Sequence, residues 1–231
     1  RDRSMNEEQK EKLNIISKNA DFLSDIFSTI LDFKRAELID KEVKEKPVEL
    51  VAFVRIIVNA FDYLAKSSGI GLSYRSDVPN LVVVIDTIKL ERILYNLISN
   101  ALKFTKQGGM VDIILSYTES SQYFSIQIKD TGIGIGYENQ SKIFEKFYRE
   151  NEGNNSRGLG LGLYTTRKFL QVMGGDVAIQ SVPQKGTTIT VTFLANRIEI
   201  APDREELGAD NNVFTVLLVE DNMQMQEYLR K

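Results

Sequence analysis

The sequence predicts an α+β fold in which helices cover one face of a mixed β-sheet. Between residues 46 and 195, strand-like runs rich in β-branched and aromatic residues are interleaved with three amphipathic helical patterns. Glycines, often paired, stand at the ends of these runs, as turns require. Upstream, residues from about 5 to 40 contain neither Gly nor Pro, so we expect a long helix before the α+β domain.

The long helix carries more apolar surface than one helix can bury. Its heptad seam consists of Leu13, Ile16, Ala20, Leu23, Phe27 and Ile30. A second apolar stripe consists of Phe22, Ile26 and Phe33. We therefore expect this helix to sit in a helical bundle or a dimer. Packing against the following domain is the alternative.

The remaining elements follow in order. We expect helices over 50–66, 87–103 and up to 173, and strands over 72–74, 82–85, 111–118, 123–129, 177–181 and 187–193. Asp86 is placed to cap the second of these helices. Residues 196–212 are charged and irregular, which indicates a linker. Residues 213–231 begin with a buried strand that ends in acidic residues, as at the start of another domain.

Composition excludes several classes of function. With 42% apolar and 26% charged residues, the 231-residue chain can form a packed core, which argues against disorder. The net charge of −3 provides no basic field, so we expect no nucleic-acid partner for this fragment. The absence of Cys and His from the sequence excludes thiolate and imidazole chemistry. No apolar run approaches the roughly 20 residues that span a bilayer. The two ends lead us to expect a piece cut from a longer protein.

Two glycine clusters indicate a phosphate-binding function. Asp130-Thr-Gly-Ile-Gly-Ile135 leaves an expected strand, and Gly158-Leu-Gly-Leu-Gly-Leu163 opens an expected helix. Alternating glycines before a helix allow backbone N–H groups to approach a polyphosphate. The second cluster is not a dinucleotide-binding fingerprint, because Leu163 occupies the last glycine position and no strand precedes it. A glycine-rich loop without a ligand remains the alternative.

Polar residues on the expected helix over 87–103 suggest a metal site. Asn96 and Asn100 share one face, and Lys103 follows them. Their carboxamide oxygens could help to complete a Mg²⁺ shell made of phosphate oxygens and water. Lys103 would offer a point charge to the same phosphates. Asp130 could accept a hydrogen bond from an exocyclic amine such as that of adenine. A solvated helix face and a turn-forming Asp are the alternatives.

Four motifs in order resemble the N, G1, F and G2 boxes of sensor histidine kinases. They are Asn96-Leu-Ile-Ser-Asn-Ala-Leu-Lys-Phe-Thr105, Asp130-Thr-Gly-Ile-Gly134, Ile143-Phe-Glu-Lys-Phe-Tyr-Arg149 and Gly158-Leu-Gly-Leu-Gly-Leu163. Gly186-Thr-Thr188 resembles the last motif of the same ATP-binding domain, so the resemblance covers residues 5–195. The long helix, ending Leu31-Asp-Phe-Lys-Arg35, looks like the second helix of the dimerisation and phosphotransfer hairpin. Val216-Leu-Leu-Val-Glu-Asp-Asn222 looks like the first strand of a response-regulator receiver domain.

The resemblance implies a domain plan and an activity. Residues 1–45 would be an incomplete hairpin, 46–195 the catalytic domain, 196–212 a linker and 213–231 a receiver fragment. The catalytic domain would be the two-layer α/β sandwich of histidine kinases, gyrase and heat-shock chaperones. With ATP and Mg²⁺, it would phosphorylate a histidine on a helix outside this sequence, for relay to a receiver aspartate. The parent would be a homodimer anchored through upstream membrane segments, with this portion in the cytoplasm.

The resemblance also implies a role for each motif residue. Asn100 would bind Mg²⁺, with Asn96 beside the phosphates and sharing that role. Asn96, Lys103 and Arg149 would form the catalytic set. The nucleotide would be bordered by Phe104 and by the turn residues Gly132, Gly134 and Ile135. Asp130 would bind the adenine amine, with Thr187 supporting it through water. The segment 136–157 would be a lid anchored by Phe144 and Phe147. The phosphate-side hinge would consist of Gly158, Gly160, Gly162 and Leu163.

Departures from the family pattern limit what this fragment can do. Because the sequence has no His, we expect ATP binding without autophosphorylation. The related ATPases of gyrase, chaperones and mismatch-repair proteins hydrolyse ATP with a glutamate at the position of Asn96. An amide cannot act as a base, so hydrolysis is disfavoured. A non-catalytic nucleotide-binding scaffold is a further alternative.

Overall fold

The computed structural model describes residues 43–149 and 159–196, together with scattered positions between 6 and 34. In chain order, its elements are β1 (Lys46–Glu49), α2 (Leu50–Ala60), α3 (Asp62–Ser67), β2 (Gly71–Ser76), β3 (Val82–Ile85), α4 (Thr87–Phe104), β4 (Met110–Thr118), β5 (Tyr123–Asp130), the 3₁₀ turns η1 (Tyr137–Asn139) and η2 (Lys142–Phe144), α5 (Gly162–Val172), β6 (Asp176–Val182) and β7 (Gly186–Leu194).

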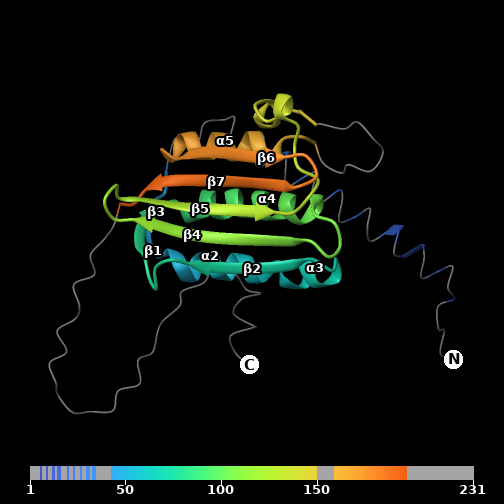
Figure 1. Ribbon diagram of the computed structural model, residues 1–231, viewed down its shortest axis with the longest axis horizontal. Helices are drawn as coiled ribbons and strands as arrows, with labels where there is room; N and C mark the ends of the chain where they lie inside the picture. The colour runs from blue at the N-terminus through green and yellow to red at the C-terminus, as the bar shows by residue number, and fades with distance from the viewer. Residues whose placement is uncertain are drawn as a thin grey trace, which may run out of the picture. The chain divides into compact units, whose positions relative to one another are not determined.

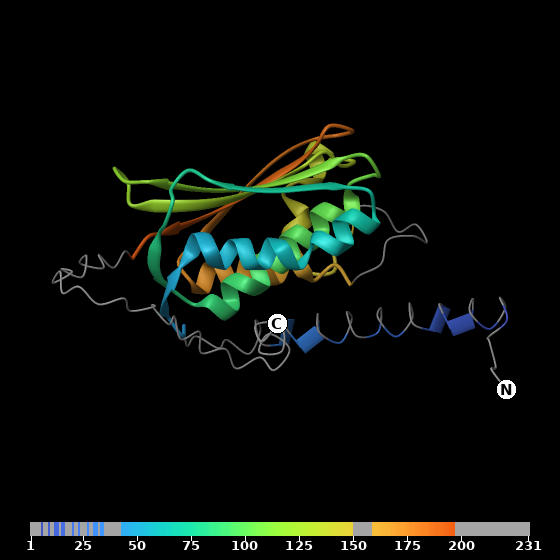
Figure 2. The ribbon, with the colours of Figure 1, turned by 90° about the horizontal axis from the view of Figure 1, so that it is seen from below.

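Five strands form one mixed sheet in the order β2-β4-β5-β7-β6 (Figure 1). β2 and β4 are parallel, and each of the other neighbouring pairs is antiparallel. Seen from below, α2, α4 and α5 all lie on one face of this sheet (Figure 2). This arrangement confirms the α+β prediction of helices on one face of a mixed sheet.

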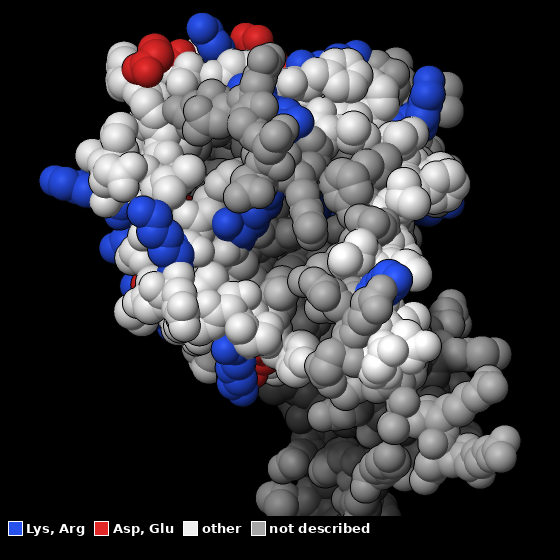
Figure 3. Space-filling model, turned by 90° about the vertical axis from the view of Figure 1, so that its right-hand side faces the viewer, with Lys and Arg blue, Asp and Glu red and all other residues white. Residues whose placement is uncertain are grey.

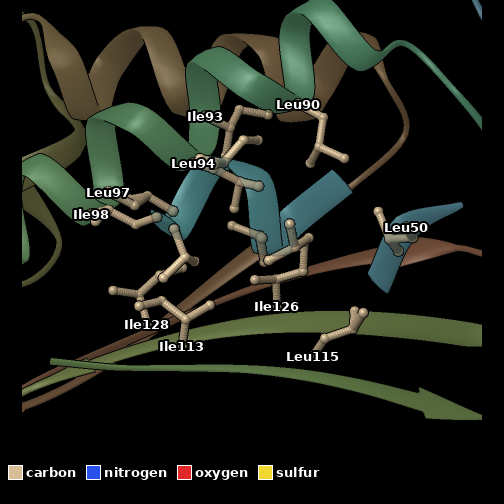
Figure 4. Packing of buried hydrophobic residues seen from close by; sticks show 14 of the residues in the cluster. Leu50, Leu90, Ile93, Leu94, Leu97, Ile98, Ile113, Leu115, Ile126 and Ile128 are labelled. Atoms are coloured by element: carbon tan, nitrogen blue, oxygen red, sulfur yellow. The ribbon is translucent and has the colours of Figure 1, made fainter. Parts of the chain in front are cut away.

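The core lies between α4 and the inner face of the sheet. Figure 4 shows α4 side chains pointing toward residues of β4 and β5. The α4 stripe is Leu90, Ile93, Leu94, Leu97 and Ile98, and the facing strand residues include Ile113, Leu115, Phe124 and Ile126, all at most 1% exposed. Each such side chain contributes about 1.5–3 kcal/mol on burial. The apolar face of α4, with its helical period, and the apolar faces of the strands, with their period of two, therefore pack into one continuous core.

Two features differ from the sequence prediction. The helix expected over 50–66 is divided at Phe61, whose N–H bonds to the Val58 carbonyl in a tight turn. The Phe61 ring packs 4.9 Å from that of Tyr95, so tertiary packing accounts for the break. Strand β1 was not expected, because it contains Pro47. Proline lacks an N–H but is tolerated here, since β1 pairs only with β3 in the described part of the chain.

The N-terminus of α4 is closed by a buried carboxylate, as predicted. Asp86 accepts hydrogen bonds from the backbone N–H groups of Lys89 and Lys44, each at 3.0 Å, and its Oδ2 lies 2.7 Å from Lys89 Nζ. Burial alone would raise the pKa of Asp86. The Lys89 side chain and the two N–H groups outweigh that effect, and its pKa lies below the ordinary value.

β3 holds both segments that lead out of the domain. β1 pairs with it antiparallel, placing Pro47 opposite Val84. Val84 also donates its N–H to the carbonyl of Asn196, just beyond β7, at 3.0 Å. The first and last described segments of the domain are therefore bonded to one short strand.

The described positions between 9 and 34 are helical, as expected. The exposed seam residues among them are Leu13, Ile16, Ala20, Leu23, Phe27 and Ile30. The predictions for residues 197–231, including the linker and the receiver fragment, lie outside the described residues. Among the helices that can be described, none is long and apolar enough to cross a membrane.

Candidate functional site

The C-terminal half of α4 carries two linked amides. Asn96 Nδ2 donates to Thr166 Oγ1 on α5 at 2.8 Å, and Asn100 Nδ2 donates to Asn96 Oδ1 at 3.4 Å. Both amino groups are thus directed toward protein acceptors. Within the described residues, no hydrogen bond engages Asn100 Oδ1, which leaves this oxygen as a potential ligand. Of the two predicted metal ligands, Asn100 keeps an amide oxygen without a described partner, whereas Asn96 Oδ1 accepts from Asn100.

Asp130 lies at the end of β5 with one carboxylate oxygen fixed. Its Oδ1 accepts the N–H of Gly132 at 2.8 Å and that of Thr187 at 3.2 Å. Among the described residues, its Oδ2 has no hydrogen-bond partner. Burial raises the pKa of Asp130, and the two N–H groups offset only part of this effect. The side chain is thus an oriented acceptor whose second oxygen can bind a donor.

The turn after Asp130 is held against the neighbouring hairpin. Gly134 has a φ of +68°, and a Cβ there would meet the backbone of Val182, so only glycine fits without displacement. The Ile135 N–H donates to Ser181 Oγ at 2.8 Å. The Ile133 N–H bonds to the carbonyl of Phe104, the last residue of α4. The turn is therefore tied both to α4 and to β6.

Two cations lie near the end of α4. Burial lowers the pKa of Lys103, and the positive charge of Arg149 lowers it further, which places these two predicted residues in one electrostatic environment. Lys103 Nζ lies 5.1 Å from the centre of the half-exposed Phe104 ring. Figure 3 looks onto this end of the molecule, where Lys and Arg side chains are spread over the visible face. Such a surface attracts a polyanion.

No described side chain caps the N-terminus of α5. Unlike α2 and α4, which Glu49 and Asp86 cap, α5 begins after Leu161 without a side-chain cap. The N–H groups of its first turn, including that of Leu163, can therefore bind an anion. A Cβ on Gly162 would collide with the Asn96 amide, so glycine lets α5 approach α4. Of the predicted hinge glycines, Gly160 bonds through its carbonyl to the Phe147 N–H. Gly158 lies outside the described residues.

The predicted lid is described only up to residue 149. Of its two predicted anchors, Phe144 is buried, whereas Phe147 is 62% exposed and lies 6.2 Å from the ring of Phe33. Gln140 fixes the beginning of this segment. Its Nε2 donates to the carbonyls of Ser181 at 2.8 Å and Ile135 at 3.2 Å.

Three contributing residues escaped the sequence prediction: Thr166, Ser181 and Gln140. Thr166 orients Asn96, and the other two hold the turn after Asp130. One signal for Ser181 was available. It follows Val177 and Ile179 at a spacing of two, so it is a polar residue on the apolar face of a strand.

Comparison with known proteins assigns the fold. Residues 85–197 match the family of histidine kinase-, DNA gyrase B- and HSP90-like ATPases. The aerobic respiration control sensor protein ArcB of Escherichia coli (strain K12) is 32% identical over 228 residues, covering 95% of this chain and 29% of ArcB. The signal transduction histidine-protein kinase BarA of the same strain is 34% identical over 188 residues, covering 78% of this chain and 20% of BarA. The chain thus spans less than a third of these curated relatives.

A solved structure has the same fold. Full-length ShkA in complex with AMPPNP matches with a TM-score of 0.71 at 24% identity, covering 84% of this chain and 40% of ShkA. The α+β region therefore has the fold of the ATP-binding domains of histidine kinases, and the predicted fold is confirmed. More particularly, it is homologous to the corresponding parts of ArcB and BarA.

Proposed function

We propose that this chain binds ATP with Mg²⁺ and acts as the catalytic domain of a hybrid sensor histidine kinase. It would transfer the γ-phosphate of ATP to a histidine outside this sequence, which has none. The observation that carries the proposal is the Asp130 carboxylate, with Oδ1 fixed by two backbone N–H groups and Oδ2 without a bond to a described residue. This acceptor suits the exocyclic amine of adenine, and Thr187 lies beside it.

The other end of the nucleotide would lie along α4 toward α5. From Phe104 to Asn96 the helix rises about 12 Å, a length suited to an extended nucleoside triphosphate. Phosphates would meet the open first turn of α5, with Lys103 and Arg149 neutralising charge. Phosphoryl transfer depends chiefly on such positioning and neutralisation, so these groups together with Mg²⁺ could supply much of the catalysis.

The chemistry of the donors fits Mg²⁺. The ion prefers oxygen ligands and keeps phosphate oxygens and waters in its shell, so one or two amide oxygens can complete its coordination. Asn100 would bind it through Oδ1, and Asn96 would share this role or orient Asn100. In the part of the chain that the structure describes, no group of three acidic residues could hold a metal instead.

The proposed partners follow from the domain plan. The exposed seam residues at the described helical positions between 9 and 34 support pairing in a homodimeric bundle that includes the histidine-bearing helix. The acidic strand motif ending at Asn222 supports a receiver domain as the next acceptor. The kinship with sensor proteins supports a membrane-anchored parent with this portion in the cytoplasm.

Hydrolysis of ATP by this domain is the weaker candidate. The related ATPases would need a base where Asn96 stands, and this amide donates its N–H to Thr166. A calorimetric titration with a non-hydrolysable ATP analogue, with and without Mg²⁺, tests the proposal. We expect saturable one-to-one binding that Mg²⁺ strengthens. Absence of binding at millimolar nucleotide, in a chain shown to be folded, would leave a nucleotide-free scaffold.

The transfer step needs a second assay. A chain extended to include the histidine-bearing helix should become phosphorylated from ATP, and its Lys103→Ala variant should do so more slowly. A wild-type rate in that variant would remove Lys103 from the catalytic set.

A further inference from the structure

A single hydroxyl connects the turn after Asp130 to the start of β7, and both segments orient Asp130. Ser181, near the end of β6, accepts the Ile135 N–H at 2.8 Å and donates to the Gly186 carbonyl at 3.0 Å. It also shares a 2.8 Å hydrogen bond with the hydroxyl of Thr187, its cross-strand partner on β7. The N–H groups that fix Asp130 Oδ1 come from these same two segments, Gly132 in the turn and Thr187 at the start of β7.

The bonding capacity of Ser181 determines how Thr187 is oriented. A serine hydroxyl has one proton and two acceptor lone pairs. Ser181 can satisfy its three partners together only by donating to Gly186 and accepting from Ile135 and Thr187. The Thr187 proton is then directed toward Ser181, and its remaining lone pairs are acceptors. Thr187 and Asp130 Oδ2 together present only acceptors, which suit an amine and repel a carbonyl oxygen.

Gln140 supports the same turn from the other side. Its amide donates to the carbonyl oxygens of Ile135 and Ser181. Both backbone polar groups of Ile135 are thus held, the N–H by Ser181 and the C=O by Gln140. The turn after Asp130 is joined to β6 by two independent side chains.

We propose that Ser181 is a positioning residue that sets the preference of the site for a 6-amino purine over a 6-oxo purine, with Gln140 holding the turn on which this preference depends. The inference rests on the proposed nucleotide-binding function. Without the Ser181 hydroxyl, the Thr187 hydroxyl can rotate and donate to a 6-oxo group. The turn after Asp130 and the start of β7 also lose the hydroxyl that joins them.

The test compares the affinities of ATP and inosine triphosphate, each with Mg²⁺, by calorimetry. We expect the unaltered chain to prefer ATP, and Ser181→Ala to reduce that preference about tenfold. Ser181→Thr keeps the hydroxyl and should restore the preference. A merely structural role would weaken both nucleotides by the same factor, and that result would overturn the inference.

A second variant covers the case in which Ser181→Ala fails to fold. Gln140→Glu lies outside the strands and places an acceptor-only carboxylate against two carbonyl oxygens. It should also lower the ratio of ATP to inosine triphosphate affinity, and an unchanged ratio would count against the inference. If the unaltered chain binds neither nucleotide, the proposed function itself fails. If it prefers ATP and Ser181→Ala retains the full preference, only the role of Ser181 fails.

Discussion

Asp86, which is buried, and Asp130, which is half-buried, lie near the two ends of α4, yet their environments shift their pKa values in opposite directions. Asp86 has two backbone donors and the Lys89 ammonium, and its pKa is lowered. Asp130 has two backbone donors on one oxygen and no described cation beside it, and its pKa is raised. A carboxylate whose two oxygens both accept hydrogen bonds stabilises the fold. Withdrawing a carboxylate from water while one oxygen lacks a partner costs free energy, which a bound donor can offset.

Removing the satisfied carboxylate should have the largest effect. Asp86→Ala removes the buried carboxylate that bonds to Lys89 and caps the N-terminus of α4, so we expect a loss of about 3 kcal/mol in the free energy of unfolding. Denaturant unfolding measures it. Asp86→Asn keeps the cap but loses the charge, and should cost about half as much. A loss below about 1 kcal/mol in Asp86→Ala would contradict the comparison.

Changing the unsatisfied carboxylate should affect binding and spare stability. In Asp130→Asn, the backbone N–H groups select the amide oxygen as their acceptor, which turns an NH₂ donor toward the adenine amine. We expect ATP affinity to fall about 30-fold, corresponding to about 2 kcal/mol. Titration calorimetry measures the affinity, and the melting temperature provides the control. Unchanged affinity would refute the adenine role of Asp130.

The amide pair provides a smaller effect specific to Mg²⁺. Asn100→Ala removes the available amide oxygen, so the gain in ATP affinity on adding Mg²⁺ should shrink about tenfold. Gln127→Ala is a matched control, because it removes a half-buried amide from β5 that bonds only weakly, at 3.5 Å, to Thr190. Identical Mg²⁺ titrations of the Asn100 variant and the unaltered chain would exclude Asn100 as a ligand.

We expect the smallest effects from pH, which should change the stability of the fold in opposite directions through the two aspartates. The lowered pKa of Asp86 stabilises the fold above the ordinary aspartate pKa, and this contribution is lost as pH falls through the lowered value. The raised pKa of Asp130 has the opposite sign, because the folded state takes up its proton first and gains stability as pH falls through the raised value.

Nucleotide affinity should follow Asp130 on the acid side. Because the amine binds the ionised carboxylate, ATP affinity should decline as pH falls through the raised pKa of Asp130. On the alkaline side it should decline as Lys103, whose pKa is lowered, loses its proton. Affinity measured across pH, with Asp130→Asn for reference, checks this. An acid limb that persists in the variant would have another origin.

Local patterns predicted most of this fold. The apolar stripe of α4, its Asp86 cap and the alternation of the strands depend on residues close together in the sequence, and the structure contains all three. The division at Phe61 depends on its packing against Tyr95, which no local pattern contains. Pro47 in β1 depends likewise on which side of the strand is paired.

The site divides in the same way. Asn100, Asp130 and the glycine turns stand in recognisable motifs, and the structure brings them to one end of α4. Ser181 and Gln140 act through the register of β6 on β7 and the path of the turn after Asp130, which only folding establishes. The contact of Thr166 could not be predicted from the sequence, because its hydrogen bond with Asn96 depends on how α5 packs against α4.

The bonding of β3 has a consequence for engineering. Pro47 and Asn196 flank Val84 on opposite sides, so the two borders of the domain lie about two strand spacings, or ~10 Å, apart. Such neighbouring borders permit circular permutation, and they permit insertion of the domain into a surface loop of a host protein. The new ends could then be opened at the Glu119–Gln122 hairpin turn, remote from Asp130 at the far end of β5.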